Sequence, residues 1–288
     1  MSDDLKLIEQ WEKETGITLE RVPLEKIVDH AATTGFAADD NGRVRGLSIW
    51  NEKLRRLPEL LSKFQRLEKL GLMGTQISDI SSLNELKGLT HLNLYSNQIS
   101  DISSLKELKG LTDLTLVNNQ ISDISSLKEL KGLTVLNLAV NQISDISSLK
   151  ELKGLTDLNL SRNQISDISS LKEFKRLKEL YLSDNQISDI SSLKELKGLT
   201  DLNLVANQIS DISSLKELQN LKKLYLMNNK ITHIPAEFLD LGLEIKCKLE
   251  MGDGIYLEGN PLESPPVEII KKGNEAIRQY FKSLEGEK

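Results

Sequence analysis

The sequence is poor in the residues on which several classes of function depend. Only one of its 288 residues is a cysteine, Cys247, so no disulfide can form within the chain. Secreted proteins are often stabilised by disulfides, and this chain is therefore expected in a reducing, cytoplasmic environment. The three histidines, His30, His91 and His233, are far apart in the sequence and predict no histidine-based metal site.

Long apolar runs and nucleotide-binding motifs are also missing. No run of about 18 apolar residues occurs, so no membrane span is expected. The acidic start of the chain, Met-Ser-Asp-Asp-Leu-Lys, lacks the apolar segment of a signal peptide. Neither Gly-x-x-x-x-Gly-Lys-Ser/Thr nor Gly-x-Gly-x-x-Gly is present, and there is no nucleophile elbow. No cofactor, no catalytic residue and no enzymatic activity are therefore predicted.

Positive charge is not in excess, and aromatic residues are few. The formal net charge is −6, and residues 1–42 account for all of it with ten acidic and four basic side chains. A nucleic acid or an anionic membrane surface is therefore not an expected partner. Aromatic residues make up 4% of the chain, so the core must consist of leucine and isoleucine.

What the sequence has in abundance is one repeated segment. Gln-Ile-Ser-Asp-Ile-Ser-Ser-Leu occurs seven times, every 22 residues, starting at Gln76, Gln98, Gln120, Gln142, Gln164, Gln186 and Gln208. This period and leucine spacing are typical of a leucine-rich-repeat solenoid, an α/β fold with a curved parallel inner sheet and short helices or 3₁₀ segments on its convex side. The pattern Leu-x-Leu-x-x-Asn-x-Ile predicts ten strands, near Leu47, Leu70, Leu92, Leu114, Leu136, Leu158, Leu180, Leu202, Leu224 and Ile255.

Polar residues and a glycine at fixed positions of the repeat have predicted structural roles. An asparagine after each strand should bond backbone groups inside the turn, at Asn97, Asn119, Asn141, Asn163, Asn185, Asn207, Asn229 and Asn260. Ser170 and Glu173 have the spacing of a capping box, so a short helix or 3₁₀ segment should begin at Ser170. A left-handed helix end is predicted at Gly88, Gly110, Gly132, Gly154 and Gly198. A solvated edge, or less favourably a calcium-binding row, is predicted at Asp79, Asp101, Asp123, Asp145, Asp167, Asp189 and Asp211.

The ends of the chain differ from the repeats and predict caps. Residues 1–42 should form an N-terminal helical cap, with one helix ending near Gly16, a second over Leu24–Ala32 and a turn at Asp39–Gly42. An acidic docking element is the alternative for this segment. Residues 43–262 form the repeats, including an insertion at 236–254. Residues 263–288 form a C-terminal capping helix over Val267–Leu284 that leads to a downstream domain absent here.

The repeats are near copies of one another, so their differences can be compared directly. The convex segments barely change, whereas residues around the inward-pointing leucines of the strands vary. We interpret the varying positions as a concave recognition surface for a protein partner; drift at permissive exposed positions is the alternative. The predicted partner-binding residues are Trp50, His91, Tyr95, Asp113, Asn118, Val135, Val140, Asp157, Arg162, Glu179, Tyr181, Asp184, Asp201, Lys223, Tyr225 and Met227.

The segments 241–246 and 254–281 resemble the end of the repeat domain in prokaryotic Roco proteins. They read Leu-Gly-Leu-Glu-Ile-Lys and Gly-Ile-Tyr-Leu-Glu-Gly-Asn-Pro-Leu-Glu-Ser-Pro-Pro, continuing to Gln-Tyr-Phe. The resemblance implies the N-terminal part of a longer signalling GTPase, whose GTP-binding Roc domain and COR domain would follow Lys288. The repeats would then bind partner proteins or the Roc-COR module. The repeat itself resembles those of internalins and of the nuclear regulatory subunit of protein phosphatase 1. The alternatives are thus a stand-alone adaptor or phosphatase-regulator-like scaffold, or a cell-surface adhesin, which the missing signal peptide disfavours.

Overall fold

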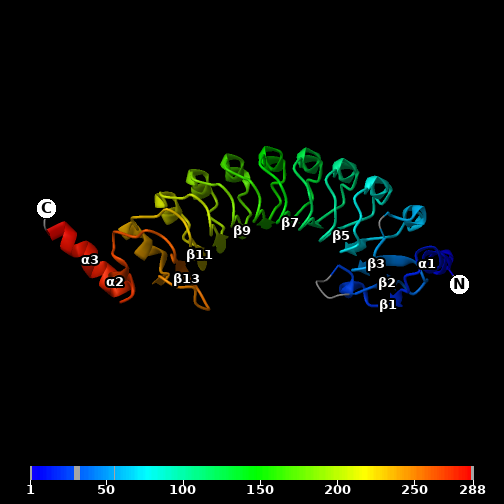
Figure 1. Cartoon of the computed structure of the whole chain (residues 1–288), viewed down its shortest axis with the longest axis horizontal. Helices are drawn as coiled ribbons and strands as arrows, with labels where there is room; N and C mark the ends of the chain where they lie inside the picture. Colours follow the sequence, from blue (N-terminus) through cyan, green and yellow to red (C-terminus); the bar gives the residue numbers. More distant parts are fainter. Residues whose placement is uncertain (1, 29–32, 55, 287–288) are drawn as a thin grey trace. The chain divides into compact units, whose positions relative to one another are not determined.

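The computed structural model describes residues 2–28, 33–54 and 56–286, which form two compact units, Met1–Ile143 and Ser144–Lys288. In each unit a repeat contributes one short strand and one short 3₁₀ helix, and Figure 1 shows the strands on one side and the 3₁₀ helices on the other. The leucine-rich-repeat solenoid predicted from the 22-residue period is confirmed.

The first unit begins with a helix and a hairpin, and the repeats follow. Strands β1 to β7 are neighbours in sequence order; β2 and β3 are antiparallel and the other pairs are parallel. The elements are α1 (Asp3–Thr15), β1 (Glu20–Arg21), η1 (Leu24–Lys26), β2 (Gly35–Ala38), β3 (Val44–Trp50), η2 (Glu59–Lys63), β4 (Lys69–Met73), η3 (Ser81–Glu85), β5 (His91–Asn93), η4 (Ser103–Glu107), β6 (Asp113–Thr115), η5 (Ser125–Glu129) and β7 (Val135–Asn137).

The second unit continues the repeats and ends in helices. Its strands are parallel, in the order β8-β9-β10-β11-β13-β12. The elements are η6 (Ser147–Glu151), β8 (Asp157–Asn159), η7 (Ser169–Glu173), β9 (Glu179–Tyr181), η8 (Ser191–Glu195), β10 (Asp201–Asn203), η9 (Ser213–Glu217), β11 (Lys223–Tyr225), η10 (Ala236–Leu241), β12 (Ile245–Lys246), β13 (Gly254–Tyr256), α2 (Val267–Ile270) and α3 (Asn274–Gly286).

All ten predicted strands are present, and the leucine at the centre of each repeat strand is buried. Leu92 pairs with Leu114 in the first unit, and Leu180 pairs with Leu202 in the second. Each buried leucine or isoleucine stabilises the fold by roughly 1.5–3 kcal/mol, and stacking against the neighbouring repeats completes its burial. The core is therefore a continuous column of aliphatic side chains within each unit.

The asparagine column bonds the backbone as predicted. The side-chain amide of Asn185 donates to the carbonyls of Leu160 (3.0 Å) and Leu182 (3.1 Å), and its Oδ1 accepts from the N–H of Ile165 (3.0 Å). The amide thus joins its own turn to the preceding repeat. The column extends beyond the repeats to Asn274, which bonds the N–H of Ile245 and the carbonyl of Leu243.

The predicted 3₁₀ segment is present as η7, but the predicted capping box and the predicted left-handed glycines are wrong. Helix η7 begins at Ser169, whose N–H donates to the Asp167 carboxylate (2.8 Å), whereas the Ser170 hydroxyl donates to the Ile146 carbonyl of the preceding repeat (3.4 Å). None of Gly88, Gly110, Gly132, Gly154 and Gly198 has a positive φ. A Cβ at Gly110 would instead lie 3.2 Å from the Leu89 carbonyl oxygen, so close packing between repeats favours glycine there.

The cap predictions hold in part. The first helix is confirmed: α1 ends at Gly16, which is left-handed, and buries Ile8 and Trp11. The second is wrong where it is described, because η1 stops at Lys26 and Ile27 is extended; residues 29–32 lie outside the described residues. The C-terminal helix is broken into α2 and α3 at Gly273 (φ 87°), since Asn274 must bond the β12 segment. The division into cap, repeats and cap stays a prediction.

A left-handed residue follows each repeat strand, and in several repeats it is neither glycine nor asparagine. The φ angle is 58° at Val140, against 56° at Asn118 in the preceding repeat. A β-branched side chain is strained in this conformation, which costs roughly 1–2 kcal/mol relative to a residue that tolerates it.

Replacing this valine should stabilise the fold. Val140→Asn is expected to raise the free energy of unfolding by about 1 kcal/mol, because asparagine tolerates the left-handed region. Urea unfolding followed by circular dichroism measures the change. Val135→Asn, the same substitution in the extended backbone of β7, is the matched control and should not stabilise the protein. An equal change in the free energy of unfolding for both variants would contradict the explanation that Val140 is strained.

Candidate functional site

The strand face is the exposed side of the repeat strands, opposite the buried leucines. It comprises the first and third residues of each three-residue strand and the residue two positions further on, as in His91 and Asn93 of β5 and Tyr95 after it; Asn93 itself is buried. Successive side chains on a strand point to opposite sides, so these three share one side. Equivalent residues of adjacent strands are in register, which builds three rows across each unit.

In the first unit the strand face contains a hollow of about 360 Å³ that is uncharged as far as the described lining residues go. Trp50 and Tyr95, both predicted as partner-binding residues, lie at the same hollow. Its other lining residues are Met73, Asn93, Thr115, Val117 and Asn137. Beside it in the first row, His91 Nε2 lies 3.5 Å from the Asp113 carboxylate, and Val135 is half-buried. The hollow therefore combines apolar side chains with uncharged polar ones and lies next to a row that contains charged groups.

In the second unit the strand face is acidic and aromatic. Asp157, Glu179 and Asp201 occupy the same register position on β8, β9 and β10. Tyr181 donates to the Glu179 carboxylate (2.7 Å), and burial together with that carboxylate raises the pKa of the Tyr181 hydroxyl, which therefore stays protonated. Lys223 lies 3.6 Å from Asp201 and offsets part of the negative charge.

Next to the acidic row, two stacked tyrosine rings lie on the adjacent strands β11 and β13. The Tyr225 and Tyr256 rings are 5.0 Å apart and nearly parallel, with an interplanar angle of 11°. Tyr256 is fully buried, and Tyr225 is half-buried on the strand face beside the half-buried Met227. The stack covers one face of the Tyr225 ring, and the rest of the ring is partly exposed on the strand face.

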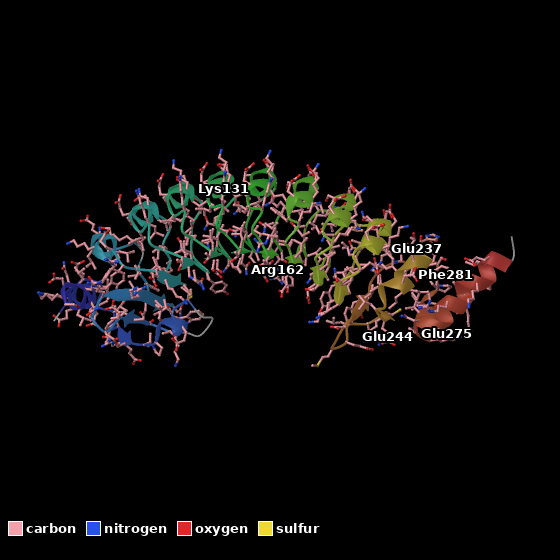
Figure 2. The ribbon with its side chains drawn as sticks, turned by 180° about the vertical axis from the view of Figure 1, so that it is seen from behind. Lys131, Arg162, Glu237, Glu244, Glu275 and Phe281 are labelled. Carbon is pink, nitrogen blue, oxygen red and sulfur yellow. The ribbon has the colours of Figure 1, made fainter. Side chains whose placement is uncertain are left out.

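Four of the predicted residues lie in the turn after the strand rather than on the strand face. Asn118, Val140, Arg162 and Asp184 all have left-handed backbones, with φ between 55° and 58°. Arg162 Nε lies 3.9 Å from the Asp184 carboxylate, and both side chains are half or more exposed. In Figure 2, Arg162 lies on the strand side of its unit, whereas Lys131 lies on the 3₁₀ side of its own. This row borders the strand face.

The aspartate row, which was predicted to be a solvated edge or a calcium row, caps the 3₁₀ helices. In each of the seven copies the carboxylate accepts the N–H of the serine two residues later at 2.8 Å. This bond and the serine hydroxyl lower the pKa of Asp189 below its ordinary value of 3.8. Within the described residues no group of three or more potential ligands could hold a metal ion.

The lowered pKa predicts that folding stability falls at acid pH. Because the folded pKa lies below the unfolded one, the stabilisation is complete above about pH 4 and is lost as the pH falls through the folded pKa. Asp189→Asn keeps an acceptor for Ser191 but cannot be protonated. The loss of unfolding free energy between about pH 5 and pH 2.5 should therefore be smaller than in the wild type. Asp240→Asn, at an exposed position of η10, is the control, and an equal change in both variants would contradict the capping role.

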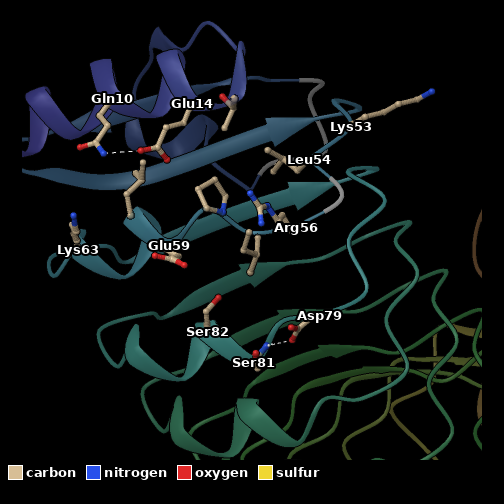
Figure 3. Close-up of a pocket in the computed structure, with 14 residues that line it drawn as sticks. Gln10, Glu14, Lys53, Leu54, Arg56, Glu59, Lys63, Asp79, Ser81 and Ser82 are labelled. Atoms are coloured by element: carbon tan, nitrogen blue, oxygen red, sulfur yellow. Dashed lines mark hydrogen bonds between the residues drawn. The ribbon is translucent and has the colours of Figure 1, made fainter.

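A larger hollow of about 800 Å³ lies between α1 and the first 3₁₀ helices, away from the strand face (Figure 3). Charges of both signs line it, including Glu14, Lys53, Arg56 and Glu59. Two of its polar groups already have partners, since Glu14 accepts from Gln10 and Asp79 accepts from Ser81. The hollow shows no consistent chemistry, and we do not assign it a ligand.

Five of the seven lining residues of the first hollow are not among the predicted partner-binding residues: Met73, Asn93, Thr115, Val117 and Asn137. Met73 follows the strand of a less regular repeat, and Thr115 and Asn137 belong to a row in which only the tyrosines had been singled out. The substitution of that asparagine row by Tyr181 and Tyr225 was the signal that the whole row faces outward.

Family models of leucine-rich repeats match most of the repeat region. The model described as Leucine Rich repeats (2 copies) matches residues 65–107, 87–129, 131–173 and 175–217, which is more than half of the chain, and the Leucine Rich Repeat model matches residues 220–241. This chain belongs to the leucine-rich-repeat family. Leucine-rich-repeat domains are generally non-catalytic scaffolds that bind proteins. Comparison with curated proteins gives no match.

Three solved leucine-rich-repeat structures are similar to the chain. An internalin (InlF) of Listeria monocytogenes is 33% identical, with a TM-score of 0.70 over 79% of this chain and 66% of that one. Internalin C2 of the same organism is 37% identical, with a TM-score of 0.60 over 61% of this chain and 77% of that one. A leucine-rich-repeat protein of Leptospira interrogans is 26% identical, with a TM-score of 0.65 over 81% and 65%. The chain thus spans 66% and 65% of the first and third of these chains.

The helices of the structure were compared with the requirements of a membrane span. Among the residues it describes, no helix combines the length and the apolar character needed to cross a bilayer.

Proposed function

We propose that this leucine-rich-repeat chain is a scaffold that recognises a partner protein through its strand face. The supporting observation is the contrast between two exposed surfaces of the same repeats. Helices η4 to η9 all read Ser-Ser-Leu-Lys-Glu, although the first serine and the lysine of η4 are exposed. Over the seven repeats of β5 to β11, the first and third strand-face rows each hold five residue types, and the middle row holds three. Exposure alone therefore does not account for where the repeats diverge.

The sequence of the exposed 3₁₀ surface hardly changes from repeat to repeat. Ion pairs between neighbouring repeats explain only part of this. Lys175 pairs with Glu195 (2.8 Å) and Lys197 with Glu217 (2.6 Å), one repeat apart. Exposed ion pairs of this kind contribute little to stability, commonly less than about 1 kcal/mol. Divergence on the strand face is better explained by selection for a ligand than by drift.

Loss of the strand-face tyrosines tests the proposal. With a partner recovered by affinity capture on the whole chain, Tyr95→Ala, Tyr181→Ala and Tyr225→Ala should each weaken binding by roughly tenfold, because buried aromatic side chains dominate protein interfaces. Arg162→Ala should weaken it less. Lys128→Ala and Lys194→Ala, on the 3₁₀ surface, are controls expected to leave affinity unchanged. Unchanged affinity in all strand-face variants, measured by calorimetry, would refute the proposal.

The flanking sequences support a finer proposal about the natural context. Their resemblance to Roco proteins supports a cytoplasmic chain that continues beyond Lys288 into Roc and COR domains, with these or a separate protein as the ligand. The similarity to internalins favours a separate recognition scaffold instead. The encoding reading frame distinguishes the two: a Gly-x-x-x-x-Gly-Lys-Ser/Thr motif within a few tens of residues after Lys288 supports the Roco assignment, and a stop codon refutes it.

A further inference from the structure

A row of polar side chains crosses the floor of the uncharged hollow in the first unit. Asn93, Thr115 and Asn137 occupy the third position of β5, β6 and β7. The Oδ1 of Asn93 accepts from the N–H of Tyr95 (3.0 Å), and the Oδ1 of Asn137 accepts from the N–H of Ala139 (3.2 Å). An N–H can bond only to an acceptor, so these bonds fix which side of each amide is the oxygen. The NH₂ groups are left to donate elsewhere.

The donors of this row are suited to a polypeptide backbone. The Asn93 NH₂ donates to the backbone carbonyl of Val28, at 3.5 Å, so a peptide carbonyl of this chain already lies at the first position. Within the part of the chain that the structure describes, the Asn137 NH₂ and the Thr115 hydroxyl have no hydrogen-bond partner. They present to a second polypeptide the same kind of group that Asn93 presents to Val28.

The walls above the row are apolar. Trp50, Met73, Tyr95 and Val117 surround a space of about 360 Å³, and among the residues that the structure describes no charged side chain lines it. Tyr95 is 40% exposed and Val117 is half-buried, so their contact surfaces are open to solvent. A space of this size accepts a large aliphatic or aromatic side chain, and its uncharged lining disfavours a charged one.

We infer that the hollow binds an extended segment of a partner protein that carries one large apolar side chain. That side chain packs among Trp50, Tyr95 and Val117, and a backbone carbonyl next to it accepts from the Asn137 NH₂. The inference rests on the proposed protein-binding function and specifies one anchor point within it.

A displayed peptide library provides the probe. Twelve-residue random peptides on phage are selected on the whole wild-type chain and counter-selected on Val117→Asp, which places a charge in the wall. The enriched peptides should share a large apolar residue. Their affinity should fall at least tenfold on Val117→Asp. It should fall roughly threefold to tenfold on Asn137→Asp, which keeps the acceptor for Ala139 but removes the donor.

Matched controls lie on the 3₁₀ surface of the same unit. Asn84→Asp in η3 makes the same chemical change as Asn137→Asp, and Lys128→Asp in η5 introduces an aspartate at an exposed position. Both should alter affinity less than twofold. Thermal unfolding of every variant verifies that it is folded. Selection that yields no peptide dependent on Val117, or peptides that Lys128→Asp weakens as much as Val117→Asp does, overturns the inference.

Binding of the natural partner to the variants distinguishes this inference from the broader proposal of a strand-face recognition surface. If Tyr181→Ala and Tyr225→Ala weaken partner binding while Val117→Asp does not, the hollow is not an anchor and the strand face still is the binding surface. If none of these substitutions affects the partner, both fail.

Discussion

Leu171→Asp is expected to unfold the repeats around it in the second unit. Leu171 lies in η7, is fully buried and belongs to the aliphatic column. The substitution removes roughly 2–3 kcal/mol of apolar burial and adds a carboxylate with no cation in the core, for a total destabilisation of at least about 5 kcal/mol. Each repeat buries its apolar side chains against its neighbours, so the damage should spread along the unit.

Hydrogen exchange measures that spread. The amides of η6 and η8, one repeat to each side, should lose protection together with those of η7. Gln186→Asp adds the same negative charge at an exposed position and should leave protection unchanged. Loss of protection confined to η7 would contradict the idea that neighbouring repeats support one another.

Asn185→Ala should destabilise the second unit almost as strongly, without changing its apolar core. The substitution leaves the buried N–H of Ile165 without an acceptor and takes donors away from the carbonyls of Leu160 and Leu182. A buried polar group left unpaired costs about 1–3 kcal/mol, so a loss of about 3 kcal/mol or more is expected.

The adjacent residue supplies the control for the asparagine. Gln186→Ala truncates an exposed side chain of similar size and should change the free energy of unfolding by less than about 0.5 kcal/mol. Urea unfolding of both variants measures the difference. If Asn185→Ala were as mild as Gln186→Ala, the asparagine column would not be what ties the repeats together.

The regular part of the fold could be predicted because local sequence determines it. The alternating leucines and the asparagine after them place every repeat strand, as Leu92 and Asn97 illustrate for β5. The roles of the glycines and serines could not be predicted this way. Gly110 lies close to a carbonyl 21 residues earlier, and the Ser104 hydroxyl bonds the Ile80 carbonyl of the preceding repeat, at 3.1 Å. These contacts exist only once the repeats are stacked.

The left-handed turn after each strand was missed for a different reason. Its usual signals are glycine and asparagine, but the position holds Val140 and Ala206 in two repeats, which tolerate the strain because the surrounding hydrogen bonds fix the turn. The variation there was interpreted as a recognition row, although the residues lie beside the strand face.

The candidate surface was predictable as a set of positions but not as a shape. Comparing the repeats identified Tyr95 and the rows around it. The hollow depends on Trp50 and Met73, which end the longer strands β3 and β4 of the less regular first repeats. Trp50 and Met73 reach the hollow because β3 and β4 pair with each other and are longer than the other strands. The repeat pattern does not specify the length of these two strands.

Site-specific photo-crosslinking to the partner tests the central claim most directly. A benzophenone amino acid is placed at position 183, on the strand face, or at position 194, on the 3₁₀ surface in η8, the helix that follows β9. A strand-face recognition surface predicts a crosslinked partner from position 183 and none from position 194. Crosslinking from position 194 alone would contradict it.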